Sequence, residues 1–174
     1  DLGLQPGHQN FTVGQRRGLG LALGDFNRDL KLDIATSRGT VLLNDGNFFN
    51  GTDWDPDTGA WLGPVKTFNS GAQAWAVETA DLDKDGILDL MVALTFRNPD
   101  PIGVLYGVGD GSFSEPKVYE GPDVGAVALW ARDMDADGLC DIVIGNRCAG
   151  TVLILRGIGN RAFEIGEIIT AFSV

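Results

Sequence analysis

The sequence predicts an all-β fold made of three similar units, and three observations lead to this prediction. First, a nine-residue acidic pattern, D-x-[D/N]-x-D-x-x-x-D, occurs at 25–33, 81–89 and 133–141, which we call the first, second and third acidic loops. Second, a short apolar run stands on each side of every loop, and the runs that follow are partly β-branched, as in strands. Third, no helix is needed to account for any segment. Each acidic loop is therefore expected to be a hairpin turn between two strands.

The acidic loops predict sites for a hard cation, and calcium is the first candidate. Packed carboxylates repel unless a cation lies among them, and calcium prefers oxygen ligands. An EF-hand is excluded because position 12 is not Glu in any copy but Thr36, Val92 and Ile144. The expected side-chain ligands, at positions 1, 3, 5 and 9, are Asp25, Asn27, Asp29 and Asp33, then Asp81, Asp83, Asp85 and Asp89, and finally Asp133, Asp135, Asp137 and Asp141.

The similarity between the copies extends well beyond the loops. After each loop a second and a third strand are expected, followed by a Gly-rich turn that ends on Phe and by a weaker fourth strand. The turns are 44–48, 109–113 and 159–163. The repeats cover approximately 11–66, 67–118 and 119–174, with a period of about 50 to 56 residues, which suits a four-stranded propeller blade. The chain is thus predicted to be a single β-propeller region, 1–174, of three blades.

These motifs resemble a known family. The segments G-D-F-N-x-D, A-D-L-D-K-D-G, L-D-[IL] and G-D-G-S-F-x-x-P are similar to the FG-GAP/VCBS repeats of integrin α-subunit propellers and of many secreted or surface proteins. The resemblance covers nearly the whole chain. It implies a β-propeller with calcium in the loop between the first two strands of a blade. It says much less about which molecule the protein recognises, because propellers host many functions.

Carried over position by position, the resemblance adds backbone ligands and a ranking of the sites. The carbonyl oxygens of Lys31, Ile87 and Leu139 are the expected backbone ligands. The second and third loops match fully, with glycine at position 6. The first loop has the neutral Asn27 and carries Leu30 at position 6, where a positive φ would cost a branched residue roughly 1 kcal/mol. The first of the three sites is therefore expected to be the weakest.

Composition argues against several classes of function. The net charge is −11, and eleven of the 24 acidic side chains lie in the acidic loops. Much of the excess of negative charge is therefore expected to serve metal binding. No basic stripe suits nucleic acid, and no apolar stretch is long enough to insert into a membrane. The only histidine, His8, lies in a polar leading segment, so catalytic triads and zinc sites are disfavoured and no enzyme activity is expected. Cys140 and Cys148 are expected to be thiols, or to form a link elsewhere in a larger protein.

One polar insertion, from about 47 to 63, interrupts the first repeat. Its Trp54, Asp55, Asp57 and Trp61 are candidate ligand-binding residues, since exposed aromatic rings beside carboxylates can grip a sugar ring or a protein loop. The alternative is a local anchor in which the tryptophans tuck under the loop. Asn10 and Asn50 stand in glycosylation sequons, which, with the resemblance, favours a secreted or cell-surface glycoprotein.

The functional expectation is a calcium-binding, non-enzymatic, extracellular module for adhesion or recognition of a protein or glycan. A lectin proper and a scaffold for a glycan-cleaving enzyme are the alternatives. Known propellers generally need four to eight blades, so the ring is expected to be completed by further blades or by another copy of the chain.

Overall fold

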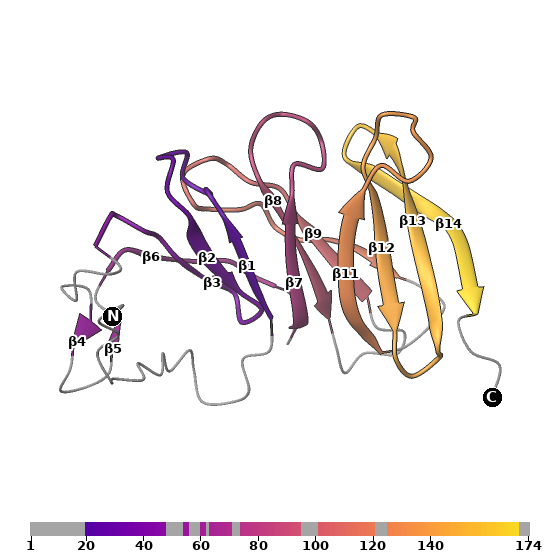
Figure 1. Ribbon diagram of the computed structural model, residues 1–174, viewed down its shortest axis with the longest axis horizontal. Coiled ribbons are helices and arrows are strands. Elements are labelled where there is room, and N and C mark those ends of the chain that lie inside the picture. Colours follow the sequence, from indigo (N-terminus) through magenta and orange to yellow (C-terminus); the bar gives the residue numbers. More distant parts are fainter. Residues whose placement is uncertain are drawn as a thin grey trace, which may run out of the picture.

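The computed structural model describes residues 20–47, 54–55, 60–61, 63–70, 74–94, 101–120 and 125–170. Within these residues the chain forms three four-stranded antiparallel sheets that stand side by side (Figure 1), together with one two-stranded hairpin. None of the described residues is helical, and none of them forms an apolar helix long enough to cross a membrane. The predicted all-β, propeller-type fold is confirmed, and we call the three large sheets the first, second and third blades.

The strands follow the chain in order within each blade. The first blade consists of β1 (Leu21–Gly24), β2 (Asp33–Thr36), β3 (Thr40–Leu42) and β6 (Val65–Thr67). The second consists of β7 (Ala74–Ala80), β8 (Asp89–Leu94), β9 (Pro101–Leu105) and β10 (Lys117–Glu120). The third consists of β11 (Ala126–Arg132), β12 (Asp141–Asn146), β13 (Thr151–Gly159) and β14 (Ala162–Thr170).

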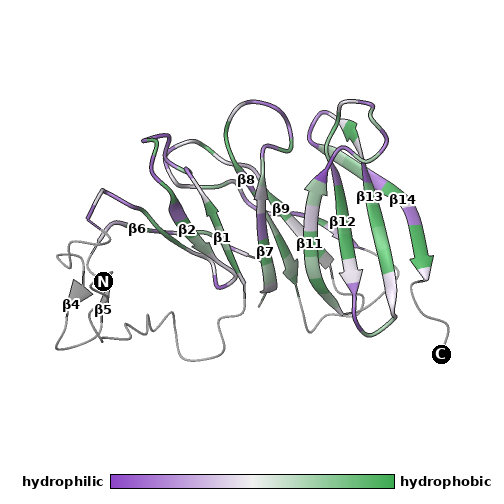
Figure 2. Ribbon diagram, in the orientation of Figure 1, coloured by the Kyte–Doolittle hydropathy of each residue, from purple (hydrophilic) through white to green (hydrophobic). Residues whose placement is uncertain are grey.

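Apolar residues on both faces of the second blade create two cores. Strand β8 is buried at every residue, and successive side chains of a strand point to opposite faces of its sheet. Leu90 and Val92 therefore belong to the core shared with the first blade, whereas Met91 and Ala93 belong to the core shared with the third. Figure 2 shows this hydrophobic character along β8, β12 and β13. The central blade is thus stabilised by burial on both sides, which is the main favourable term in folding.

The Gly-rich turn of the second blade packs onto the first acidic loop. The ring of Phe113 meets Phe26 and Phe68 edge to face, with centroids 5.6 and 5.7 Å apart. The Gly111 N–H also donates a hydrogen bond of 2.9 Å to the Phe26 carbonyl. In the third blade Phe163 takes the same position and lies in one core with Leu82 of the second acidic loop. The turns of the second and third blades therefore each cover the acidic loop of the preceding blade.

The insertion of the first blade holds a short hairpin that was not predicted. Strands β4 (Trp54–Asp55) and β5 (Ala60–Trp61) pair antiparallel, and Trp54 is the backbone partner of Trp61. The remaining candidates Asp57, Asn10 and Asn50 lie outside the described residues. Both cysteines are free, as expected, with Cys140 half-buried and Cys148 exposed.

Candidate metal centre

The three acidic loops are hairpin turns that join the first and second strands of each blade, as predicted, and they lie along one end of the molecule, at the top of Figure 1. Position 4 has a positive φ in every loop: 64° at Arg28, 64° at Lys84 and 62° at Ala136. Position 6 does as well, with 82° at Gly86 and 87° at Gly138. These two left-handed residues turn the chain sharply enough for the side chains at positions 1, 3 and 9 to converge.

The loops are held in shape by hydrogen bonds from their own backbone to the aspartates. The carboxylate at position 1 accepts from the N–H of position 6, at 2.8 Å from Leu30, 3.0 Å from Gly86 and 2.9 Å from Gly138. The carboxylate at position 5 accepts from the N–H of position 7, at 3.0, 2.8 and 2.7 Å. Such bonds orient the oxygens in advance, so a cation would order little of the chain on binding.

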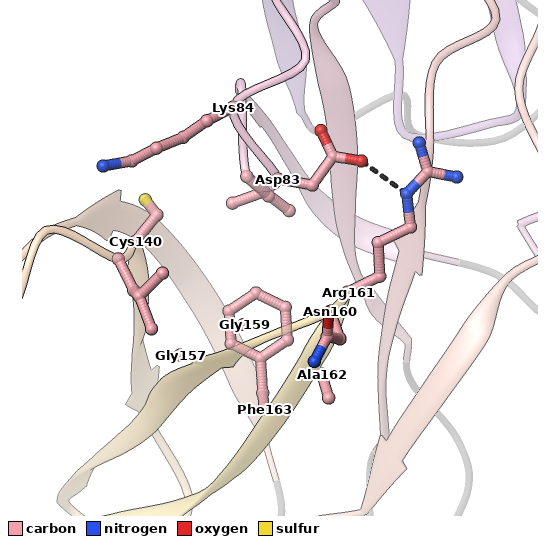
Figure 3. Close-up of a pocket in the computed structure, with 11 residues that line it drawn as sticks. Asp83, Lys84, Cys140, Gly157, Gly159, Asn160, Arg161, Ala162 and Phe163 are labelled. Atoms are coloured by element: carbon pink, nitrogen blue, oxygen red, sulfur yellow. Dashed lines mark hydrogen bonds and ion pairs between the residues drawn. The ribbon is translucent and has the colours of Figure 1, made fainter.

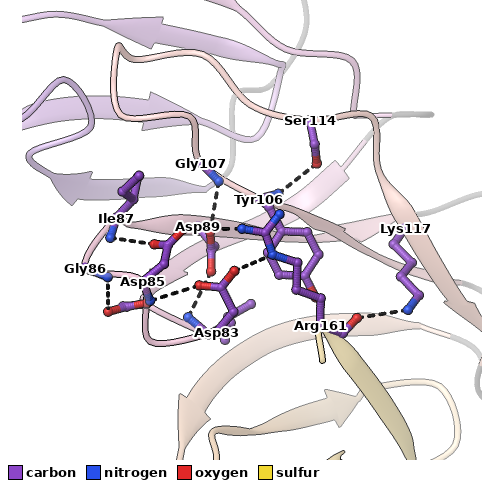
Figure 4. Close-up of polar contacts among 12 residues, drawn as sticks. Asp83, Asp85, Gly86, Ile87, Asp89, Tyr106, Gly107, Ser114, Lys117 and Arg161 are labelled. Carbon is purple, nitrogen blue, oxygen red and sulfur yellow. Dashed lines mark hydrogen bonds and ion pairs between the residues drawn. The ribbon is translucent and has the colours of Figure 1, made fainter. Parts of the chain in front are cut away.

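The aspartate at position 9 is buried in all three loops. Asp33, Asp89 and Asp141 each accept one hydrogen bond from the N–H of position 2 and one from a residue near the end of the third strand or just past it. For Asp89 these donors are Leu82 and Gly107, both at 2.9 Å (Figure 4). Burial raises the pKa of Asp89 to about 6 in spite of these two bonds, and burial also raises the pKa of Asp33.

The donor near the third strand is a glycine in two of the blades because there is no room for a side chain. A Cβ at Gly107 would lie 2.3 Å from the Leu88 carbonyl oxygen, and a Cβ at Gly157 would lie 2.4 Å from that of Cys140. Glycine allows the backbone to come close enough to donate to the buried aspartate. This role was not predicted from the sequence, because the glycine follows the aspartate at different distances, by 18 residues in the second blade and by 16 in the third.

The second and third loops each bring three carboxylates together. Asp81, Asp83 and Asp89 each offer an oxygen within 4.8 Å of the others, and so do Asp133, Asp135 and Asp141. Among the described residues no third group of this kind forms at the first loop, where Asn27 replaces the second aspartate. All of these donors are hard oxygens, so each group fits calcium. Asp85 and the Ile87 carbonyl are close in sequence to the group of the second loop, and Asp137 and the Leu139 carbonyl are close to that of the third.

Basic side chains lie on the ligand carboxylates of all three loops, and the sequence analysis did not identify them. Lys31 Nζ lies 3.0 Å from Asp29 Oδ2, and this contact lowers the pKa of Asp29. Arg156 pairs with Asp135 inside the third blade, and Arg161 reaches Asp83 and Asp85 from the neighbouring blade. No fixed spacing links these cations to their loops, so a pattern search could not have found them.

A small pocket lies between the second acidic loop and the third blade (Figure 3). Its volume is about 100 Å³, and Asp83, Lys84, Cys140, Arg161 and Phe163 are among the residues that line it. Lys84, at the edge of this pocket, donates a hydrogen bond to the Gly138 carbonyl of the third loop. The second loop is thus bound to the third blade from two sides.

Replacing Leu30 by glycine is expected to raise the free energy of unfolding by up to about 1 kcal/mol. Leu30 has a φ of 66° and is 95% exposed, so its side chain contributes little packing to offset the strained backbone. Chemical denaturation of Leu30→Gly beside Leu30→Ala is the measurement, because the alanine variant keeps the Cβ that causes the strain. Equal stabilities of the two variants would contradict the prediction.

The comparison with protein families agrees with the geometry. Residues 81–144 match the FG-GAP-like repeat, a range that starts at the second acidic loop and ends just after the third. The resemblance stated from the sequence is confirmed for this region, which is a β-propeller-like module. No curated protein matches the chain.

Proposed function

We propose that this chain, which carries an FG-GAP-like repeat over residues 81–144, is a calcium-binding module of an extracellular β-propeller that recognises a protein or a glycan without catalysing a reaction. The observation that carries the proposal is the pair of three-carboxylate groups at equivalent places in two blades. FG-GAP-like repeats are typical of extracellular proteins, where calcium is plentiful enough for weak sites.

Calcium would be held by oxygens that the loops already orient. In the third loop these are the carboxylates of Asp133, Asp135, Asp137 and Asp141 with the Leu139 carbonyl, and the second loop offers the equivalent set. The cation would neutralise the repulsion among the carboxylates and hold each hairpin rigid. The loops would then present a fixed surface, which lowers the entropy cost of binding a partner.

A calorimetric calcium titration tests the metal part of the proposal. Asp133→Ala is expected to remove one binding event, because position 1 supplies a carboxylate to the third group. Asp45→Ala is the matched control, since Asp45 is an acidic residue in an exposed turn, outside the acidic loops, whose carboxylate accepts from the Asn47 N–H. A wild-type protein that takes up no calcium would overturn the proposal.

The arc of three blades has an uncovered end at the third acidic loop. The residue at position 2 is 1% exposed for Phe26 and 7% exposed for Leu82, each covered by the turn of the next blade, but 55% exposed for Met134. Trp130 in β11 is 65% exposed, although Ala22 at the same register position of the first blade is buried. Both residues are placed as if a further blade followed.

The opposite end of the arc shows the complementary feature. Leu23, Ile34, Leu42 and Val65 form one cross-strand row on the first blade, and Leu23 and Val65 are exposed. The residues at the register of Ile34 in the other blades, Leu90 and Ile142, are buried against the preceding blade. The chain therefore presents one face that suits a preceding blade and one that suits a following blade.

Light scattering of the isolated chain is expected to show association, for example a particle of twice the 18.5 kDa chain mass in which two copies make six blades. Trp130→Lys should weaken this association, because it puts a charge on the uncovered face. Arg147→Ala is the control, since Arg147 is exposed in the turn between β12 and β13 and its loss changes one charge without altering a strand. A stable, well-folded monomer would contradict the prediction.

The proposed recognition site is the insertion of the first blade, at Trp54, Asp55, Asp57 and Trp61. The described residues of this insertion form the separate β4–β5 hairpin and add no strand to a blade, and functional residues concentrate in long segments of this kind. Deleting residues 51–60 is expected to abolish binding to a ligand found by glycan array or by protein capture. Unaltered binding by the folded deletion variant would place the recognition site elsewhere.

A further inference from the structure

Arg161 connects the third blade to the second acidic loop. It lies in the turn between β13 and β14, at the place where the second blade has Gly111 in its own Gly-rich turn. Its φ is 58°, a conformation that glycine adopts freely and arginine does not. The equivalent position of the second blade is glycine, so the two turns differ here by the presence of the arginine side chain.

The guanidinium of Arg161 lies across two expected metal ligands (Figure 4). Its Nε donates to Asp83 Oδ2, and its Nη2 lies 3.3 Å from Asp85 Oδ2. The ring of Tyr106 supports it, with Arg161 Cζ 4.7 Å from the ring centroid. The backbone is fixed as well, since Lys117 Nζ donates to the Arg161 carbonyl at 2.9 Å. Contacts to its side chain and to its backbone therefore hold Arg161 in place.

We propose that Arg161 competes with calcium for the carboxylates of the second acidic loop, and that calcium binding there is thereby coupled to the contact between the second and third blades. This inference rests on the proposed calcium binding. It assigns to Arg161 a role in setting the affinity of one site, so that the second site binds more weakly than its four aspartates alone would allow.

Two physical arguments support competition rather than assistance. A dication at the centre of the loop and a guanidinium on the same two carboxylates repel each other, and the side chain of Asp83 is only 9% exposed, so solvent screens this repulsion incompletely. Asp85, which is not in the group that already converges, must also turn toward Asp81, Asp83 and Asp89 to bind calcium, whereas Arg161 contacts its Oδ2 from the third blade. Because coupling is reciprocal, calcium must weaken the Arg161 contact by the factor by which Arg161 weakens calcium.

The experiment is a calcium titration of Arg161→Gln, which keeps length and polarity but removes the charge. The affinity of the second site is expected to rise roughly tenfold, because the variant removes the repulsion between the dication and the guanidinium on the same two carboxylates. Adding Asp81→Ala to each protein identifies the part of the titration that belongs to the second loop. Arg147→Gln is the matched control, because it removes one exposed charge far from the loop.

A second measurement distinguishes coupling from a local charge effect. In chelator, Arg161→Gln is expected to be less stable than the wild type. At saturating calcium the difference in stability should shrink by the free energy that corresponds to the gain in affinity. Arg161→Lys should bind calcium like the wild type, because it keeps the charge. An unchanged or lower affinity in Arg161→Gln, with a wild type that binds calcium, overturns this inference alone. If neither protein binds calcium at the second loop, the proposed function fails there too.

Discussion

Removing calcium with a chelator is expected to lower the melting temperature of the protein by roughly 10 to 20 °C. A ligand that binds only the folded state adds about 2.7 kcal/mol at one hundred times its dissociation constant, so two well-formed sites add about 5 kcal/mol. For a chain of this length each kcal/mol corresponds to about 2 to 4 °C. The two sites counted are the groups that contain Asp81 and Asp133.

Calorimetry in chelator, followed by calcium in excess, measures this effect. Magnesium at the same concentration is the control, because it requires a stricter octahedral geometry and retains its water, so it should restore much less of the lost stability. Metal analysis must show calcium on the protein at the start. Identical melting curves with and without chelator would contradict the prediction.

Asp141→Ala is expected to destabilise the protein by about 2 to 5 kcal/mol even in chelator, where no metal contributes. Asp141 is 1% exposed and accepts hydrogen bonds from the N–H groups of Met134 and Gly157, at 2.8 and 2.9 Å. Its removal leaves both donors without an acceptor, and each unsatisfied buried group costs about 1 to 3 kcal/mol. The buried aspartate is therefore structural as well as a candidate ligand.

Asp137→Ala is the matched control in the same loop. Asp137 is exposed and its carboxylate accepts from the exposed N–H of Leu139, so its loss should change stability in chelator by less than about 0.5 kcal/mol. In calcium both variants should lose metal-dependent stability. Chemical denaturation in chelator and in calcium separates the two roles, and equal losses for both variants in chelator would refute the structural role of Asp141.

The fold could be predicted from the sequence because the same local signals recur in three copies. A loop such as 81–89 needs a strand on each side, and β7 and β8 stand on its two sides as expected. The positive φ at Leu30 was also expected, since the other two loops carry glycine there. A short pattern such as an acidic loop is a weak signal alone, but the same pattern at the same place in three repeats is a strong one.

The missing parts depend on contacts between segments that are distant in the sequence. Nothing near Arg161 indicates that its side chain reaches Asp83, and nothing near Gly107 indicates that its N–H serves Asp89. The hairpin of β4 and β5 was also missed, because strands of two residues leave no periodic pattern to detect. Such features follow from the packing of blades and turns, which only the structure describes.

The covering of the second acidic loop by the third blade also has a consequence for synthesis. The partner atoms of Asp83 and Arg161 are 78 residues apart, so at ordinary translation rates of about 5 to 20 residues per second the loop emerges roughly 4 to 16 seconds before its arginine. During that interval the second acidic loop has no guanidinium competing for its carboxylates. A nascent chain that emerges where calcium is plentiful would meet the cation first, and the third blade would then dock onto a loop that is already filled.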